Sequence, residues 1–176
     1  LLQTFSCKGQ TETTTEQSLQ EVEVKSQLFD ADALLERVRF LSLDSLEGRR
    51  TGEKGGLIAR DYVVSQFKKN GISPLLSEYT QPFSFEGRRD KKTYEGANVL
   101  GLIKGTEHPE KYIVISAHYD HVGVNNGEIY NGADDDASGT SAIIAIAEYL
   151  QNNPPKHSVI IAAFDAEEMG DRKSVV

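Results

Sequence analysis

The sequence predicts an α/β fold that contains a pair of parallel strands joined by a helical crossover. Residues 112–117 and 158–164 are short runs rich in Val, Ile and Ala, as expected of buried strands. Between them, apolar residues recur at helical spacing: Ala142, Ile143, Ile146, Ala147 and Leu150. Because strand, helix and strand follow in that order, the two strands should lie parallel and be covered on both faces.

Two amphipathic helices are expected before any strand. In the first, within 30–41, the apolar residues are Leu34, Leu35, Val38 and Leu41, and Asp30 or Asp32 is a possible N-cap. In the second, they are Ile58, Ala59, Tyr62, Val63 and Phe67, and Gly71 marks its end. Residues 75–80 and 98–103 are strand candidates, whereas the polar stretch 81–96 suits an exposed hairpin or loop.

Both ends of the chain have compositions unlike the rest. Residues 1–28 have low hydrophobicity and no sustained period, so we expect a disordered tether. Cys7 follows a short apolar start, as in bacterial lipoproteins. A lipid anchor at Cys7 would place the protein in the bacterial cell envelope, as a periplasmic protein or an outer-membrane lipoprotein. Secretion is the other location that we expect. A stray thiol is the alternative. Residues 171–176 match a translated sequencing adapter, which predicts a non-native tail.

The charge is concentrated in one segment. The 176 residues carry a formal net charge of -8, and residues 112–170 hold nine acidic side chains against Lys156 alone. Nucleic acid is therefore not expected as a partner, because phosphate binding requires clustered cations. A transmembrane segment is not expected either, because no run of about 18 apolar residues occurs.

Candidate metal-binding residues follow the predicted strands or begin the crossover helix, where open α/β sheets place their sites. The first cluster is His118-Tyr119-Asp120-His121. In a metal site, His118 would ligate through one ring nitrogen while Asp120 accepts the other N–H. Taken alone, the pair also suits an ordinary surface hydrogen bond.

Two acidic clusters follow. Asp134, Asp135 and Asp136 repel one another unless cations or helix amides offset their charge, although one of them capping the helix is the simpler interpretation. Their spacing does not fit an EF-hand. Glu167 and Glu168 come after a buried strand and point in different directions, so one can bind metal while the other acts as a base.

In order and spacing, these clusters resemble the di-zinc aminopeptidase family, which includes bacterial leucyl aminopeptidase, aminopeptidase Y and the glutamate carboxypeptidase group. The matching segments are 118–120, 132–139 and 167–168, and 46–52 resembles an N-terminal segment of the bacterial members. The resemblance implies a three-layer α/β/α zinc-peptidase fold with a mixed, mostly parallel sheet, incomplete in this chain. Residues 29–170 would form the N-terminal part of the catalytic domain.

The resemblance also implies a role for each residue toward two Zn²⁺ ions. His118 would ligate one zinc, Asp135 would bridge both, and Glu168 would ligate the second. Asp120 would be the partner of His118. Glu167 would be the general base that takes a proton from a metal-bridging water and returns one to the leaving amine.

The activity implied is that of a zinc-dependent exopeptidase, a metallo-aminopeptidase that removes N-terminal residues from peptide substrates. Three of the family's five protein ligands lie in this chain, so we expect the chain by itself to be inactive. The family often has a cis peptide bond after the bridging aspartate, which implies a cis Asp135–Asp136 bond. The positions of His108, His121 and His157 do not match the family ligands, and these residues are not assigned.

Three other functions fit part of the pattern. A glutaminyl cyclase shares the fold but works with one zinc, and a non-catalytic binding homologue keeps the fold without the metal. A soluble scaffold that binds Ca²⁺ through its acidic loop is the third alternative. Zinc stoichiometry and the release of an amino acid from a peptide anilide would distinguish them.

Overall fold

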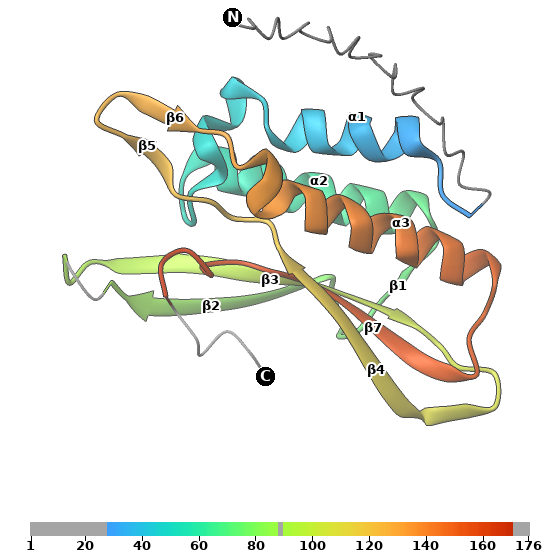
Figure 1. The fold of residues 1–176 in the computed structure, drawn as a ribbon. Helices are drawn as coiled ribbons and strands as arrows, with labels where there is room; N and C mark the ends of the chain where they lie inside the picture. Colours follow the sequence, from blue (N-terminus) through green and yellow to red (C-terminus); the bar gives the residue numbers. More distant parts are fainter. Residues whose placement is uncertain (1–27, 88–89, 171–176) are drawn as a thin grey trace, which may run out of the picture.

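In the computed structural model, which describes residues 28–87 and 90–170, three helices pack on a five-stranded sheet (Figure 1). The elements in chain order are α1 (Ala31–Leu41), the 3₁₀ segment η1 (Asp44–Arg49), α2 (Lys54–Lys69), β1 (Ser73–Pro74), β2 (Thr80–Glu86), β3 (Thr93–Ile103), β4 (His108–His118), β5 (Gly123–Asn125), β6 (Glu128–Tyr130), the π-helical turn η2 (Ala133–Ala137), α3 (Ser138–Asn152) and β7 (His157–Phe164). The predicted tether (apart from Leu28), its Cys7 anchor and the predicted tail lie outside the described residues.

The five-stranded sheet contains both strand directions. Its order is β1–β3–β7–β4, with β2 paired to β3. β4 and β7 run parallel with α3 as their crossover, whereas the β1–β3, β2–β3 and β3–β7 pairs are antiparallel. The predicted mixed sheet and its parallel pair are therefore confirmed, although antiparallel pairs outnumber the parallel pair in the described part of the chain.

All three helices lie on the same face of this sheet (Figure 1). α1 packs beside α3, and Arg37 on α1 donates to Glu148 on α3 at 2.6 Å. Because α1 and α2 join α3 on one side, residues 28–87 and 90–170 form two layers. The predicted cover on the second face is not present among them.

The hydrophobic core fills the space between the helices and the sheet. α2 contributes Ala59, Val63 and Phe67, which are four residues apart and so share one face of the helix. From the sheet, Val99 and Ile161 point toward them and are fully buried. The helical periodicity of the sequence predicts this buried face correctly.

The strand predicted at 75–80 is wrong. The chain has no regular strand there apart from Thr80, where β2 begins, and Leu76 is largely exposed. In β2, Phe83 and Phe85 alternate with more exposed neighbours, and Pro82 is tolerated because β2 pairs on one side only. The hairpin expected for 81–96 is confirmed as the β2–β3 pair.

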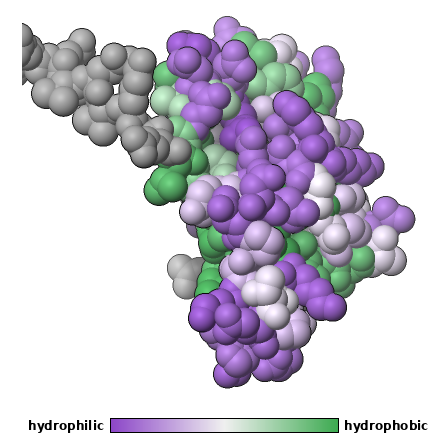
Figure 2. Space-filling model, turned by 90° about the vertical axis from the view of Figure 1, so that its right-hand side faces the viewer, coloured by the Kyte–Doolittle hydropathy of each residue, from purple (hydrophilic) through white to green (hydrophobic). Residues whose placement is uncertain are grey.

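The surface of the described residues is polar, with scattered apolar side chains. The side seen in Figure 2 is mainly hydrophilic. Exposed apolar residues include Tyr112, Ile113 and Val114 on β4, the last strand in the sheet order; each is more than half exposed. Among the described helices, none has the length and apolar character needed to cross a bilayer.

A buried arginine connects the segments that lead to the predicted site. Arg49 is fully buried, and its guanidinium donates to the carbonyls of Leu41, Tyr119, Asn131 and Gly132. Burial lowers the pKa of Arg49 to about 10, against the opposing effect of nearby carboxylates. We call this set of four hydrogen bonds the Arg49 clamp. It fixes the end of α1, the segment after β4 and the loop before η2 relative to one another.

Replacing Arg49 with Met should lower the free energy of unfolding by about 3 kcal/mol or more, because the carbonyls of the clamp lose a charged donor. Urea unfolding followed by circular dichroism measures the change. Arg60→Met is the control: Arg60 pairs with Asp61 at the surface, and its loss should change stability by less than about 1 kcal/mol. Equal effects of the two substitutions would contradict the importance of the clamp.

Candidate metal centre

The parallel pairing of β4 and β7 brings two of the predicted clusters together. His118 lies opposite Phe164 in the register, and the N–H of Tyr119 donates to the carbonyl of Phe164 at 2.9 Å. The segments that leave both strands therefore emerge side by side at the carboxyl edge of the sheet, as is usual for ligand sites in α/β folds.

His118 and Asp135 are positioned to share a metal ion. The His118 Nε2 lies 3.0 Å from Asp135 Oδ1, and the Asp135 side chain is 65% exposed. Ligand atoms of a tetrahedral zinc, with bonds of about 2.0–2.2 Å, lie about 3.3 Å apart. A small outward movement of Asp135 would therefore admit zinc between the two side chains.

The acidic loop divides its carboxylates between structure and site. Asp136 accepts from the backbone N–H groups of His118 at 3.1 Å and Gly139 at 2.9 Å, so it caps the start of α3 and fixes the end of β4. Asp135 is left pointing outward, and Asp134 is exposed. The Asp135–Asp136 peptide bond is cis, as the resemblance implies.

Asp120 has a wider role than the predicted partnership with His118. Its carboxylate lies 3.5 Å from His118 Nδ1, whereas its backbone carbonyl is closer at 3.2 Å. The fully buried carboxylate accepts instead from the N–H groups of Glu167 at 3.1 Å and Glu168 at 3.2 Å. Asp120 therefore holds the turn that carries both glutamates.

The two glutamates have different surroundings. Glu167 is exposed, and its carboxylate has no hydrogen-bond partner among residues 28–87 and 90–170. Glu168 is mostly buried, and its Oε1 lies 2.6 Å from His121 Nδ1. One carboxylate is thus exposed while the other is fixed; the division of the two into base and ligand stays a prediction.

His121, which the sequence leaves unassigned, belongs to the site. Its ring nitrogen, a carboxylate oxygen of Asp135 and one of Glu168 all lie within 4.8 Å of one another. His121 is 47 residues from Glu168, and the contact forms only because β4 and β7 pair. The rings of His108 and His157 instead contact each other at the opposite end of these strands, with their centroids 5.1 Å apart and their planes tilted by 37°.

A second buried network of hydrogen bonds, centred on Asp165, lies next to the turn that carries Glu167 and Glu168. Asp165 accepts from the Thr51 hydroxyl at 2.8 Å, the Tyr119 hydroxyl at 2.8 Å and the N–H of Ala97 at 3.0 Å. Burial raises the pKa of Asp165 despite these hydrogen bonds. Nothing in the sequence singles out Asp165 beyond its place at the end of a buried strand.

The charges around His118 favour a protonated imidazole. Burial lowers the pKa of His118, but the hydrogen bond and charge of Asp120 and the charge of Asp136 outweigh burial and raise the pKa to about 9. Positive charge therefore sits at His118 where zinc would bind.

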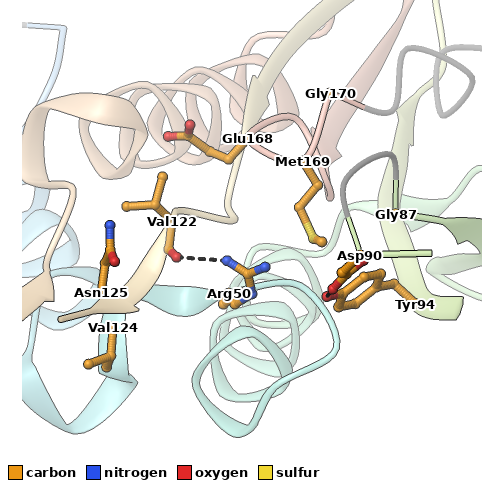
Figure 3. Close-up of a pocket in the computed structure, with 10 residues that line it drawn as sticks. All are labelled: Arg50, Gly87, Asp90, Tyr94, Val122, Val124, Asn125, Glu168, Met169 and Gly170. Carbon is orange, nitrogen blue, oxygen red and sulfur yellow. Dashed lines mark hydrogen bonds between the residues drawn. The ribbon is translucent and has the colours of Figure 1, made fainter. Parts of the chain in front are cut away.

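A cavity of about 580 Å³ opens beside Glu168 (Figure 3). Arg50 lies at its centre and donates to the carbonyl of Val122 at 3.1 Å, while its guanidinium lies 5.9 Å from the ring centroid of Tyr94. Met169 lines the cavity between Glu168 and Tyr94. The cavity is large enough to take a small ligand next to the candidate metal ligands.

Comparison with known proteins gives a family match and several relatives. The sequence model of peptidase family M28 matches residues 98–174. A probable zinc metalloprotease of Leptosphaeria maculans is 28% identical over 142 residues, which cover 76% of this chain and 32% of that protein. The chain thus spans about a third of the length of this curated relative.

Two solved structures resemble the fold. A Zn-dependent exopeptidase from Parabacteroides distasonis is 25% identical with a TM-score of 0.65, over 80% of this chain and 48% of that one. A glutaminyl cyclase from Fimbriiglobus ruber has a TM-score of 0.71 at 18% identity, over 84% of this chain and 49% of that one, which shows the fold alone. The family match covers β4, the acidic loop and the two glutamates, so residues 98–174 are similar in sequence to peptidase family M28.

Proposed function

We propose that this chain is part of a zinc-dependent exopeptidase that hydrolyses the N-terminal residue from peptides. The observation that carries the proposal is the contrast between the glutamates: Glu168 is fixed beside Asp135, whereas Glu167 is exposed and unpaired among the described residues. A hydrolytic site needs both a fixed ligand and a base that is free to exchange a proton.

The side chains present fit zinc. Imidazole nitrogen and carboxylate oxygen are donors that zinc accepts, and the 3.0 Å separation of His118 Nε2 and Asp135 Oδ1 is close to that of two ligands on one ion. His118 and Asp135 would hold one zinc, and Asp135 and Glu168 a second. When bound, zinc acts as a Lewis acid toward the scissile carbonyl.

The proton transfers fall to Glu167. Its backbone N–H is held by Asp120 at 3.1 Å, while its carboxylate extends into solvent at the edge that carries His118 and Asp135. From this position Glu167 would accept a proton from the attacking water and deliver one to the amine that leaves. The cavity beside Glu168 would receive part of the peptide.

The remaining metal ligands are expected in sequence outside this chain. Two protein ligands for each zinc are fewer than the three usual at catalytic sites, and this chain aligns with only 32% of the curated relative. We therefore expect hydrolysis from the complete gene product and not from the 176-residue chain alone.

Zinc binding to the metal-free chain at pH 7 should release about one proton from His118, because only neutral imidazole binds zinc and the pKa of His118 is raised to about 9. Calorimetric titration with zinc in two buffers of different ionisation enthalpy measures the release. His118→Asn should remove it, whereas His157→Asn at the far end of β7 should not. Binding heats that are independent of the buffer would contradict the prediction.

Glu167→Gln in the complete gene product should lower kcat by about 10²–10⁴-fold, because a general base is lost, while bound zinc is unchanged. Amino-acid release from a peptide anilide and zinc content by atomic absorption are the measurements. Asp134→Asn, which neutralises an exposed carboxylate of the acidic loop, is the control and should leave kcat within about 3-fold.

The outcome of the same assay decides between functions. Hydrolysis by the Glu167→Gln variant at the unmodified rate would refute the assignment of the base. Conversion of N-terminal glutamine to a cyclic product without amino-acid release would identify a glutaminyl cyclase instead.

A further inference from the structure

We propose that His121 is a positioning residue that fixes the Glu168 carboxylate for metal binding. The proposal rests on the zinc site described above and assigns a role to a side chain that the family resemblance leaves unassigned. His121 Nδ1 lies 2.6 Å from Glu168 Oε1, and the two side chains are only 12% and 18% exposed. An ionised carboxylate can only accept, so the Nδ1 of His121 carries the hydrogen.

The His121 ring is itself held on two sides. Its backbone N–H donates to the carbonyl of Arg49 at 3.2 Å. The ring packs against the backbone of Gly132, where an added Cβ would lie 2.5 Å from the ring Cδ2. Gly132 also has a φ of +52°, so two independent demands exclude a side chain there.

The Arg49 clamp sets the distance between these two supports. The guanidinium of Arg49 donates to the Gly132 carbonyl at 2.9 Å, and the backbone carbonyl of Arg49 accepts from the N–H of His121. The imidazole therefore lies in a slot whose position is fixed by one buried residue. Its orientation toward Glu168 is a built feature of the fold.

The geometry favours positioning over direct ligation. Two ligands of one tetrahedral zinc lie about 3.3 Å apart, a separation that the pair of His118 and Asp135 approaches at 3.0 Å. The 2.6 Å contact of His121 with Glu168 is instead the length of a charge-assisted hydrogen bond. That bond occupies Oε1 and leaves Oε2 of Glu168 for the metal.

A fixed carboxylate binds metal more tightly than a mobile one. A free Glu side chain samples several rotamers, and ligation must select one of them. With Oε1 already held by His121, the Glu168 side chain loses less freedom when its second oxygen binds zinc. Hydrogen-bond partners of metal ligands typically contribute about 10–100-fold to affinity.

The test compares His121→Ala with His121→Asn in the complete gene product. The Asn side chain places an amide N–H near the position of Nδ1 and should keep the hydrogen bond. Zinc affinity is measured by competition with a chromophoric chelator. We expect Ala to weaken binding by about 10–100-fold and Asn to stay within about 3-fold of the unmodified protein, as should the control His157→Ala.

Three results would overturn the proposal. Equal zinc affinity of the Ala variant and the unmodified protein would show that the hydrogen bond has no effect on metal binding. An equal loss in the Ala and Asn variants would make His121 a direct ligand. A complete, unmodified gene product that binds no zinc would overturn the metal centre itself, which separates failure of the proposed function from failure of this role.

The tautomer of His121 in the unmodified protein tests the same role without any substitution. Nitrogen–proton correlation spectra of zinc-loaded protein report the tautomer of each imidazole. We expect a proton on Nδ1 of His121 and none on Nε2 of His118. A zinc-coordinated, unprotonated Nδ1 at His121 would contradict the positioning role.

Discussion

The rest of the structure depends on keeping one guanidinium, that of Arg49, away from water. A buried cation loses its hydration, and this cost is offset only if its donors find acceptors. The acceptors are backbone carbonyls of Leu41, Tyr119, Asn131 and Gly132, from three separate segments. Each segment must come to the guanidinium to satisfy it. The same requirement therefore brings the end of β4 against the loop that presents the acidic residues.

The clamp also helps to explain how several acidic groups remain close together. Arg49 lies near Asp120 and Asp136, and its positive charge offsets theirs. Asp120, Asp136 and Asp165 accept backbone N–H groups, so their charge stabilises turns and a helix start. Asp135 is not engaged in this way and is largely exposed. Fewer carboxylates are thus available to bind a cation than the net charge of residues 112–170 indicates.

Local patterns predict the parts of this fold that bury one face. α1, α2, α3 and the inner strands follow apolar periodicity, because each packs on the core. β2 is expected from sequence only as part of an exposed hairpin or loop, since it pairs on one side only and Pro82 interrupts its pattern. Motif spacing is enough to find His118, Asp135 and Glu168 as candidates. It cannot find His121, whose contact with Glu168 spans 47 residues and requires the parallel pairing of two strands.

The two glutamates show why adjacent residues of one type can differ in role. Asp120 accepts the backbone N–H of each glutamate through a different carboxylate oxygen, so the two residues have equivalent backbone hydrogen bonds. Their side chains then diverge: Glu168 meets His121, while Glu167 extends into solvent. A ligand benefits from being fixed, whereas a base must release and accept protons. The difference between them therefore arises from the neighbour that the fold supplies to each side chain, and a change of that neighbour would alter the role without altering the motif.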